Sequence, residues 1–443
     1  MAGSSAVARP HLLGGALAAF VGLSLANTLP PVAQLALYLV GLAAVLQRPH
    51  GVLPVREGAL VLLAGVYVLV RRTAAGLELE WTMRLLRPCF EGYLLAHVLY
   101  KWCGIRDFKA AAAVLSGFVA LQIVAALWML LDPASRLAFI DRMYSDEGYQ
   151  NERFTGALLF RGYGLSRHHL YGLPLAVGLS AALMLIAASI ERPGRRRTWL
   201  AAVAGAALIL VAVNARIGFV PVLLCYLAGA SVFFDRYYPR HLFWLVLLLV
   251  LPLAAAGAAV LGDDFETLTT WLAAGYEQFG GDTDPEGSTF GELRTMLVLA
   301  PDAASLVLGG GRPCLTDEEC YSDIGFMRAI QEGGLALLLL ILAVYWRLNR
   351  HAVGLFRRTV GTSRRRHRRA ALLLAVVVHG TLLAAMVKGE AYGASDYSRL
   401  VAALAGLGLL AHRPRAAHAV RGAVAAAVGP GAAVADPSPG TAA

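Results

Sequence analysis

The chain of 443 residues is 58% hydrophobic and only 15% charged, with a mean hydropathy of +0.61, which excludes an ordinary soluble globular protein. Its formal net charge of +10 does not argue for nucleic-acid binding, because the arginines lie in short segments between apolar runs. Arginines placed in this way orient membrane helices and face the headgroups of membrane lipids. The composition therefore predicts an all-α, polytopic integral membrane protein.

Apolar runs of about 20 residues, the length that crosses a bilayer as a helix, recur along the whole chain. Their number predicts about twelve transmembrane helices, and basic residues gather in every second connection. Because basic segments stay on the cytoplasmic side, these connections and both termini are expected to be cytoplasmic. The predicted spans cover residues 11–28, 31–47, 57–72, 86–102, 109–131, 170–190, 198–213, 216–234, 242–261, 324–346, 370–388 and 398–412.

One connection departs from this rule, because Arg71, Arg72, Arg84 and Arg87 fall on the outer side. We expect them to belong to a helix at the membrane interface. Residues 1–415 are interpreted as one transmembrane domain. The remaining residues, 416–443, are rich in alanine, glycine and proline and are expected to form a disordered cytoplasmic tail.

Two outer connections are large, at residues 132–170 and 262–323. Residues 262–332 contain 14 acidic residues and three arginines, whereas the next 56 residues contain nine arginines and no acid. Acidic loops translocate more readily than basic ones, so the second loop is expected to be periplasmic. Its pattern predicts an amphipathic helix at residues 265–279 and a second helix at residues 289–308, with Arg294 near its start.

Cysteine is sparse, and its placement divides the five residues into two groups. Cys89, Cys103 and Cys225 lie in or beside apolar runs, whereas Cys314 and Cys320 share the second outer loop. In an oxidising periplasm these two can form a disulfide. Two free thiols are the alternative.

Arg216 lies between two apolar runs and is flanked by Asn214 and Gly218, which predicts a tight outer turn between two helices. Its guanidinium is a candidate ligand for an anion such as a diphosphate, because the planar fork donates two parallel hydrogen bonds. The alternative is an arginine that reaches up to the lipid headgroups.

The first outer loop ends in a basic, glycine-rich segment that runs directly into a span. Its candidate contacts to the same anion are Arg153, Arg161, Arg167 and His168, of which we expect only one or two to act. Neither a nucleotide-binding motif nor a metal-ligand spacing is present, so no cofactor and no metal ion are expected.

Asp323 directly precedes a span, where an aspartate can cap the helix or accept a proton from a hydroxyl nucleophile. Lys388 and Glu390 lie beside each other at the outer end of another predicted span. They can form an ion pair with each other, or the lysine can face a phosphate group. Charged groups at these depths are functional candidates because they are costly to bury.

Six fragments, in their order along the chain, resemble the O-antigen polymerase and O-antigen ligase superfamily of bacterial inner-membrane glycosyltransferases. The resemblance covers roughly residues 100–412. Each fragment is weak alone, and their order and topology together are more specific. The fragments are RFTG from Arg153, NARIGFV from Asn214, ELRTM from Glu292, LGGGR from Leu308, SDIGFMRAIQEGGLALLLL from Ser322 and VKGEAY from Val387.

The resemblance implies a GT-C-like helical fold that acts on a polyprenyl-diphosphate-linked glycan. It implies that Arg153, Arg216 and Arg294 contact the diphosphate or the acceptor, and that Asp323 is the base. The ligase branch typically has His-Asn where this chain has Ser322 and Asp323, which favours the polymerase branch. Implied partners are the lipid-linked donor and acceptor, membrane lipids, and a chain-length regulator and a flippase of the same pathway.

Three classes of function remain open at this point. The first is glycosyl transfer, by a polymerase or by a ligase with a lipid or protein acceptor. The second is a flippase or other transporter of lipid-linked oligosaccharides, which predicts charges deep within spans, whereas the charges noted above lie near predicted outer ends. The third is a membrane scaffold, which gives no reason for an isolated arginine such as Arg216.

Overall fold

The computed structural model forms only helices within the part of the chain that it describes. These residues are 11–47, 55–76, 80–144, 163–167, 171–232, 296–297, 302–310, 324–389 and 395–411. The helices are α1 (Leu12–Leu23), η1 (Leu25–Asn27), α2 (Pro31–Leu46), α3 (Val55–Ala74), α4 (Glu80–Lys101), α5 (Phe108–Leu131), α6 (Pro133–Tyr144), α8 (Gly172–Ile190), α9 (Arg195–Asn214), η2 (Arg216–Gly218), α10 (Phe219–Val232), α14 (Ala303–Leu308), α15 (Gly325–Thr359), α16 (Arg365–Lys388) and α17 (Ser395–Leu410).

Five of these helices, α5, α8, α9, α15 and α16, are long and apolar enough to cross a membrane. Helices α1, α2 and α10 are also apolar but shorter. Every predicted span except 242–261 overlaps a helix, and that span lies outside the described residues. The helical fold class is therefore confirmed, whereas the count of twelve crossings stays a prediction.

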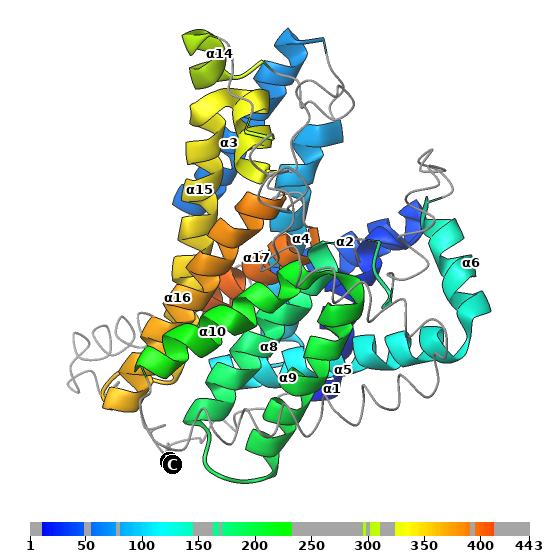
Figure 1. Cartoon of the computed structure of the whole chain (residues 1–443), viewed down its shortest axis with the longest axis vertical. Helices are drawn as coiled ribbons and strands as arrows, with labels where there is room; N and C mark the ends of the chain where they lie inside the picture. The colour runs from blue at the N-terminus through cyan, green and yellow to red at the C-terminus, as the bar shows by residue number, and fades with distance from the viewer. Residues whose placement is uncertain are drawn as a thin grey trace, which may run out of the picture.

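Helix α8 forms the centre of the bundle, and all of its residues are buried. It packs against α5, α9, α10, α16 and α17, and Figure 1 shows it running beside α9 and α10. Its sequence suits this place because it is apolar except for two serines. The hydroxyls of Ser180 and Ser189 donate to the carbonyls of Ala176 and Ile186 within the helix, so burial leaves neither hydroxyl unpaired.

Three of the basic connections, those that the structure describes after α4, α8 and α15, lie close together. The N–H of His11 donates to the carbonyl of Cys103 at 2.9 Å, and the N–H of Phe108 donates to the hydroxyl of Thr359 at 3.1 Å. The guanidinium of Arg366 donates to a carbonyl at the end of α8.

Two boundaries differ from the expected ones. Residues 133–144, expected as part of a loop, form α6, which begins after Asp132. The hydroxyl and N–H of Ser135 donate to the Asp132 carboxylate and lower its pKa below the usual range. Helix α15 also runs on to Thr359, through much of the segment that was expected to be a basic loop.

The prediction of one continuous helix at residues 289–308 is wrong. Met296 and Leu297 are not helical, and α14 is a separate short helix. The Asp302 side chain accepts the N–H of Ser305 at 2.8 Å and caps α14. The sequence also places Pro301 directly before Asp302, and proline disfavours helical geometry in the residue before it.

Candidate functional site

The turn that carries Arg216 is built against the first turns of α8. The chain leaves α9 at Asn214, makes η2 and enters α10, which confirms the predicted tight turn. A Cβ added to Gly218 would collide with the carbonyl of Pro174, and one added to Gly178 with the carbonyl of Gly218. The backbones therefore touch, and the position of the turn relative to α8 is defined. The Arg216 side chain lies outside what the structure describes.

Residues 163–167 form a non-helical segment that two side-chain amides hold in place. Asn214 accepts the N–H of Tyr163 at 3.0 Å and donates to the Tyr163 carbonyl at 2.8 Å. Gln122 of α5 accepts the N–H of Leu165 at 2.9 Å and donates to the Leu165 carbonyl at 3.5 Å. An amide side chain carries the same donor and acceptor as a peptide group, so each one pairs with the segment as a neighbouring strand would.

The rest of the segment is also held. The N–H of Gly164 points to the sulfur of Met129 at 3.4 Å, and the guanidinium of Arg136 donates to the Tyr163 hydroxyl. The hydroxyl of Ser166 donates to Asp396 of α17. Irregular backbone within a membrane protein is tolerated where protein groups satisfy it. This segment ends at the half-buried Arg167, the one predicted first-loop contact that the structure describes.

Replacing Asn214 by leucine is expected to lower the melting temperature of the protein in detergent. The change removes the side-chain amide that bonds to three backbone groups. They are the N–H and the carbonyl of Tyr163 and the carbonyl of Leu210. Each buried group left unpaired costs about 1–3 kcal/mol. Thr198→Ala is the control, because that exposed hydroxyl bonds only within its own helix. Equal melting temperatures for the two variants would contradict the role of the amide.

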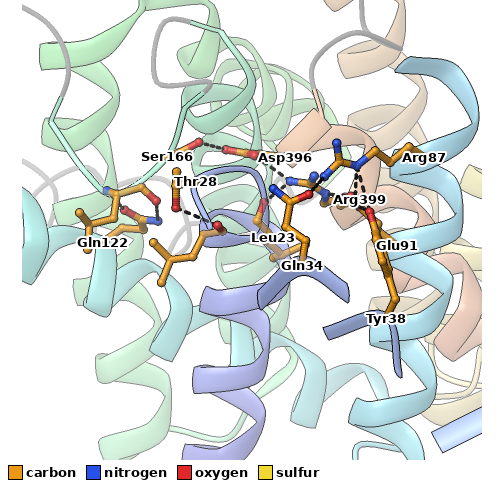
Figure 2. Close-up of polar contacts among 12 residues, drawn as sticks. Leu23, Thr28, Gln34, Tyr38, Arg87, Glu91, Gln122, Ser166, Asp396 and Arg399 are labelled. Atoms are coloured by element: carbon orange, nitrogen blue, oxygen red, sulfur yellow. Dashed lines mark hydrogen bonds and ion pairs between the residues drawn. The ribbon is translucent and has the colours of Figure 1, made fainter. Parts of the chain in front are cut away.

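A buried polar network continues from Ser166 across the bundle (Figure 2). Arg399 of α17 donates to Glu91 of α4 and to Asp396, with 3.5 Å between Arg399 Nη1 and Asp396 Oδ1. Arg399 also donates to the carbonyl of Leu23 at the end of α1, at 3.1 Å. Arg399 and Asp396 are fully buried, and Glu91 is 8% exposed.

The carboxylate of Glu91 also accepts hydrogen bonds from two further side chains. Arg87 Nε lies 2.8 Å from Glu91 Oε1, and the hydroxyl of Tyr38 on α2 also donates to this carboxylate. Arg87 in turn donates to the Gln34 side chain at 2.8 Å. Two arginines thus face two carboxylates, which offsets the desolvation that burial of single charges would cost. The network joins α1, α2, α4 and α17 to the segment that ends at Arg167.

Glu91, Asp396 and Arg399 are not among the site residues predicted from the sequence. A signal was present, because each is a charged residue in or at the edge of an apolar run, and such residues are functional candidates by default. These three charges lie within helices of the bundle, so the charges of this chain are not confined to the ends of its spans.

The start of α15 and the end of α16 meet beside the same end of α8. A Cβ added to Gly325 would collide with the carbonyl of Gly389, and one added to Gly389 would lie 2.7 Å from the ring of Tyr171. The Tyr171 hydroxyl donates to the carbonyl of Ala385 on α16. The backbone of Lys388, which ends α16, therefore comes close to the first residues of α15 and α8. Its side chain is not described.

Asp323, a candidate N-cap from the sequence, is not the N-cap of α15. The N-cap position is Ile324, whose carbonyl accepts the N–H of Arg328 at 3.0 Å. Asp323 thus lies one position before the cap, where a side chain is not in the usual place to satisfy the first free N–H groups.

The remaining predicted residues fall outside the ranges that the structure describes, so their roles stay predictions. Within those ranges, no group of three His, Cys, Asp or Glu side chains is arranged to hold a metal ion. The undescribed residues are Arg153, Arg161, His168, Arg294, Asp323 and Glu390, together with Cys314 and Cys320.

A comparison of the chain with models of known protein families finds no match, and a comparison with curated proteins finds none either.

Proposed function

We propose that this protein is a glycosyltransferase that joins polyprenyl-diphosphate-linked oligosaccharide repeat units into a polysaccharide at the periplasmic face of the bacterial inner membrane. The product is an O-antigen, a capsular polysaccharide or an exopolysaccharide. The protein crosses the membrane about twelve times, with both termini in the cytoplasm.

The observation that supports this proposal best is the meeting of four separate segments around the start of α8. They are the η2 turn that carries Arg216, the held segment that ends at Arg167, the first residues of α15 and the end of α16 at Lys388. Each of these segments carries a cationic residue, which in the first turn of α15 is Arg328. A group of cations at the outer end of the bundle suits a diphosphate at the membrane surface.

The reaction is a direct displacement at the anomeric carbon of the donor sugar. A hydroxyl of the acceptor sugar attacks that carbon, and the bond from the carbon to the diphosphate oxygen breaks. Asp323 accepts the hydroxyl proton, and the polyprenyl diphosphate leaves with the bonding electron pair. Arg216 and Arg294 stabilise its charge, with Arg153, Arg161, Arg167, His168, Lys388 and Glu390 as further contacts. One displacement inverts the anomeric configuration.

The two alternative functions are a ligase and a flippase. A ligase performs the same displacement with a lipid or protein acceptor. A flippase of lipid-linked oligosaccharides moves its substrate without breaking a bond, and the buried charges of Glu91, Asp396 and Arg399 favour it, because transporters carry such groups inside their bundles. Release of polyprenyl diphosphate distinguishes both transferases from the flippase.

Cysteines introduced at Ser288 and Ser363 test the orientation of the chain. An impermeant maleimide applied to intact cells is expected to label the first and not the second, because Ser288 lies in the acidic loop and Ser363 in the arginine-rich connection. Permeabilised cells serve as the control for reactivity. The opposite labelling pattern would invert the topology and remove the proposed site from the periplasm.

Arg216→Ala is expected to abolish polymer in cells while the protein still inserts into the membrane. Arg216→Lys should restore little, because a point charge cannot reproduce two parallel hydrogen bonds to a diphosphate. The measurement is the length distribution of surface glycans beside the amount of inserted protein. Full-length polymer in Arg216→Ala would end the assignment of this residue.

A further inference from the structure

A cavity of about 310 Å³ lies between the starts of α1, α5 and α9 and the end of α15. Ligand pockets typically measure about 300–1,000 Å³, so this space suits a small polar group. Helix α5 packs against α1 and α9 (Figure 1), and the N–H of Phe108 donates to the Thr359 hydroxyl, which joins α5 to α15. The residues that line the cavity include Leu12, Asp107, Lys109, Arg196 and Thr359.

Two cations that line this cavity are held in place by one carboxylate. Lys109 Nζ lies 3.1 Å from Glu191 Oε2, and Arg196 Nε lies 3.6 Å from Glu191 Oε1. The Arg196 guanidinium also donates to the carbonyl of Lys109 at 2.9 Å. A lysine has three donors and an arginine has five, so these contacts leave donors on both side chains for a ligand. Because two cations face one carboxylate, the three side chains together keep a net positive charge.

The surroundings of the cavity also favour an anion. Asp107 lines the cavity, but its carboxylate accepts the N–H of Ala110 at 2.8 Å and caps α5. The neighbouring connections are strongly basic, since residues 191–197 contain four arginines and one acid, and residues 357–369 contain seven arginines and no acid. The cavity therefore lies in a positive field that attracts anions.

An exposed tryptophan follows Arg196 on the same face of α9. Trp199 is three residues further along the helix, so the two side chains are neighbours, and Trp199 is 53% exposed. Its indole N–H donates to the hydroxyl of Ser116 on α5 at 3.0 Å, which fixes the ring. Exposed tryptophan at the ends of membrane helices is typical of the level of the lipid headgroups. The ring thus offers an apolar surface to an acyl chain beside the two cations.

We propose that this cavity binds the headgroup of an anionic phospholipid, with the phosphate between Lys109 and Arg196 and an acyl chain along Trp199. Basic pockets between membrane helices suit such headgroups. A choline headgroup brings its own cation next to the basic connections, so phosphatidylglycerol is favoured over phosphatidylcholine. The site lies at the opposite end of α9 from the turn that carries Arg216, and it does not depend on the proposed glycosyl transfer.

Lipid binding by the purified full-length protein tests the proposal. The protein is freed of lipid in a neutral detergent and titrated with phosphatidylglycerol, and the bound lipid is counted by native mass spectrometry. Phosphatidylcholine with the same acyl chains is expected to need about tenfold more lipid for half-saturation, because its cation opposes the contacts to the phosphate. Inorganic phosphate, which has no chain to contact Trp199, should not displace phosphatidylglycerol.

Single substitutions test which residues make the site. Lys109→Gln and Arg196→Gln are each expected to weaken binding of phosphatidylglycerol about tenfold, because each removes a charged donor to the phosphate. Each keeps the other cation beside Glu191, so the melting temperature without lipid should stay close to that of the wild-type protein. Arg365→Gln is the matched control, because this exposed arginine is not among the residues that line the cavity. Trp199→Ala should weaken both lipids alike, since their chains are the same.

Three results would overturn the proposal. Equal affinity of the wild-type protein for the two lipids would show that the charge of the headgroup is not recognised, and this result needs no variant that must fold. An equal loss of binding in Arg365→Gln and in the two cavity variants would show attraction by the basic surface as a whole. Displacement of phosphatidylglycerol by inorganic phosphate would identify a site for a free anion.

Discussion

Replacing Arg399 by alanine is expected to lower the free energy of unfolding by about 3–5 kcal/mol. The change removes the cation that lies between Glu91 and Asp396, two carboxylates in the interior of the bundle. Each then keeps a charge without its main partner or must take up a proton, and the Leu23 carbonyl also loses a donor.

The measurement is unfolding of the purified protein by titration with a denaturing detergent. Arg196→Ala is the matched control, because the Arg196 side chain is 49% exposed and its 3.6 Å contact with Glu191 is a surface ion pair. Such pairs contribute about 0–1 kcal/mol. If Arg399→Ala and Arg196→Ala had equal stability, the buried network would not hold α4, α17 and α1 together.

Asp323→Asn is expected to slow polymerisation on the order of 10²–10⁴-fold, the usual effect of losing a general base. The amide keeps the size of the side chain and cannot accept the proton. Asparagine caps helices about as well as aspartate, and the N-cap of α15 is in any case Ile324. The melting temperature should therefore stay close to that of the wild-type protein.

The test of Asp323→Asn compares turnover of a lipid-linked repeat unit with the affinity for that substrate and with a thermal melt. Slow turnover at unchanged affinity and melting temperature supports a base. Near-normal turnover would show that another group accepts the proton, and Glu390 and His168 would be the next residues to replace.

The helices were predictable because their signal is local. An apolar run identifies a span, and the asparagine and glycine around Arg216 identify a turn. Local rules also explain the two corrections beyond the spans. Asp302 caps α14 directly after a proline in the sequence, and Asp132 caps α6 immediately after α5. In both places an aspartate and a proline stand next to each other in the sequence at the start of the helix.

The polar networks were not predictable, because their partners are far apart in the chain. Glu91 and Arg399 are 308 residues apart, and Arg72 and Glu332 are 260 residues apart. A sequence shows that each charge lies in or near a span but not which charge it meets. The basic connection that contradicted the charge rule has the same explanation, because Arg72 is buried against Glu332 and is not a free surface charge.

The most direct test of glycosyl transfer uses the purified protein and a polyprenyl-diphosphate-linked repeat unit in the presence of a metal chelator. The expected product is a ladder of lipid-linked glycans that differ by one repeat unit, with one polyprenyl diphosphate released per bond formed and with no ladder in Arg216→Ala. Movement of the intact substrate across reconstituted vesicles, with no polyprenyl diphosphate released, would contradict it and identify a transporter.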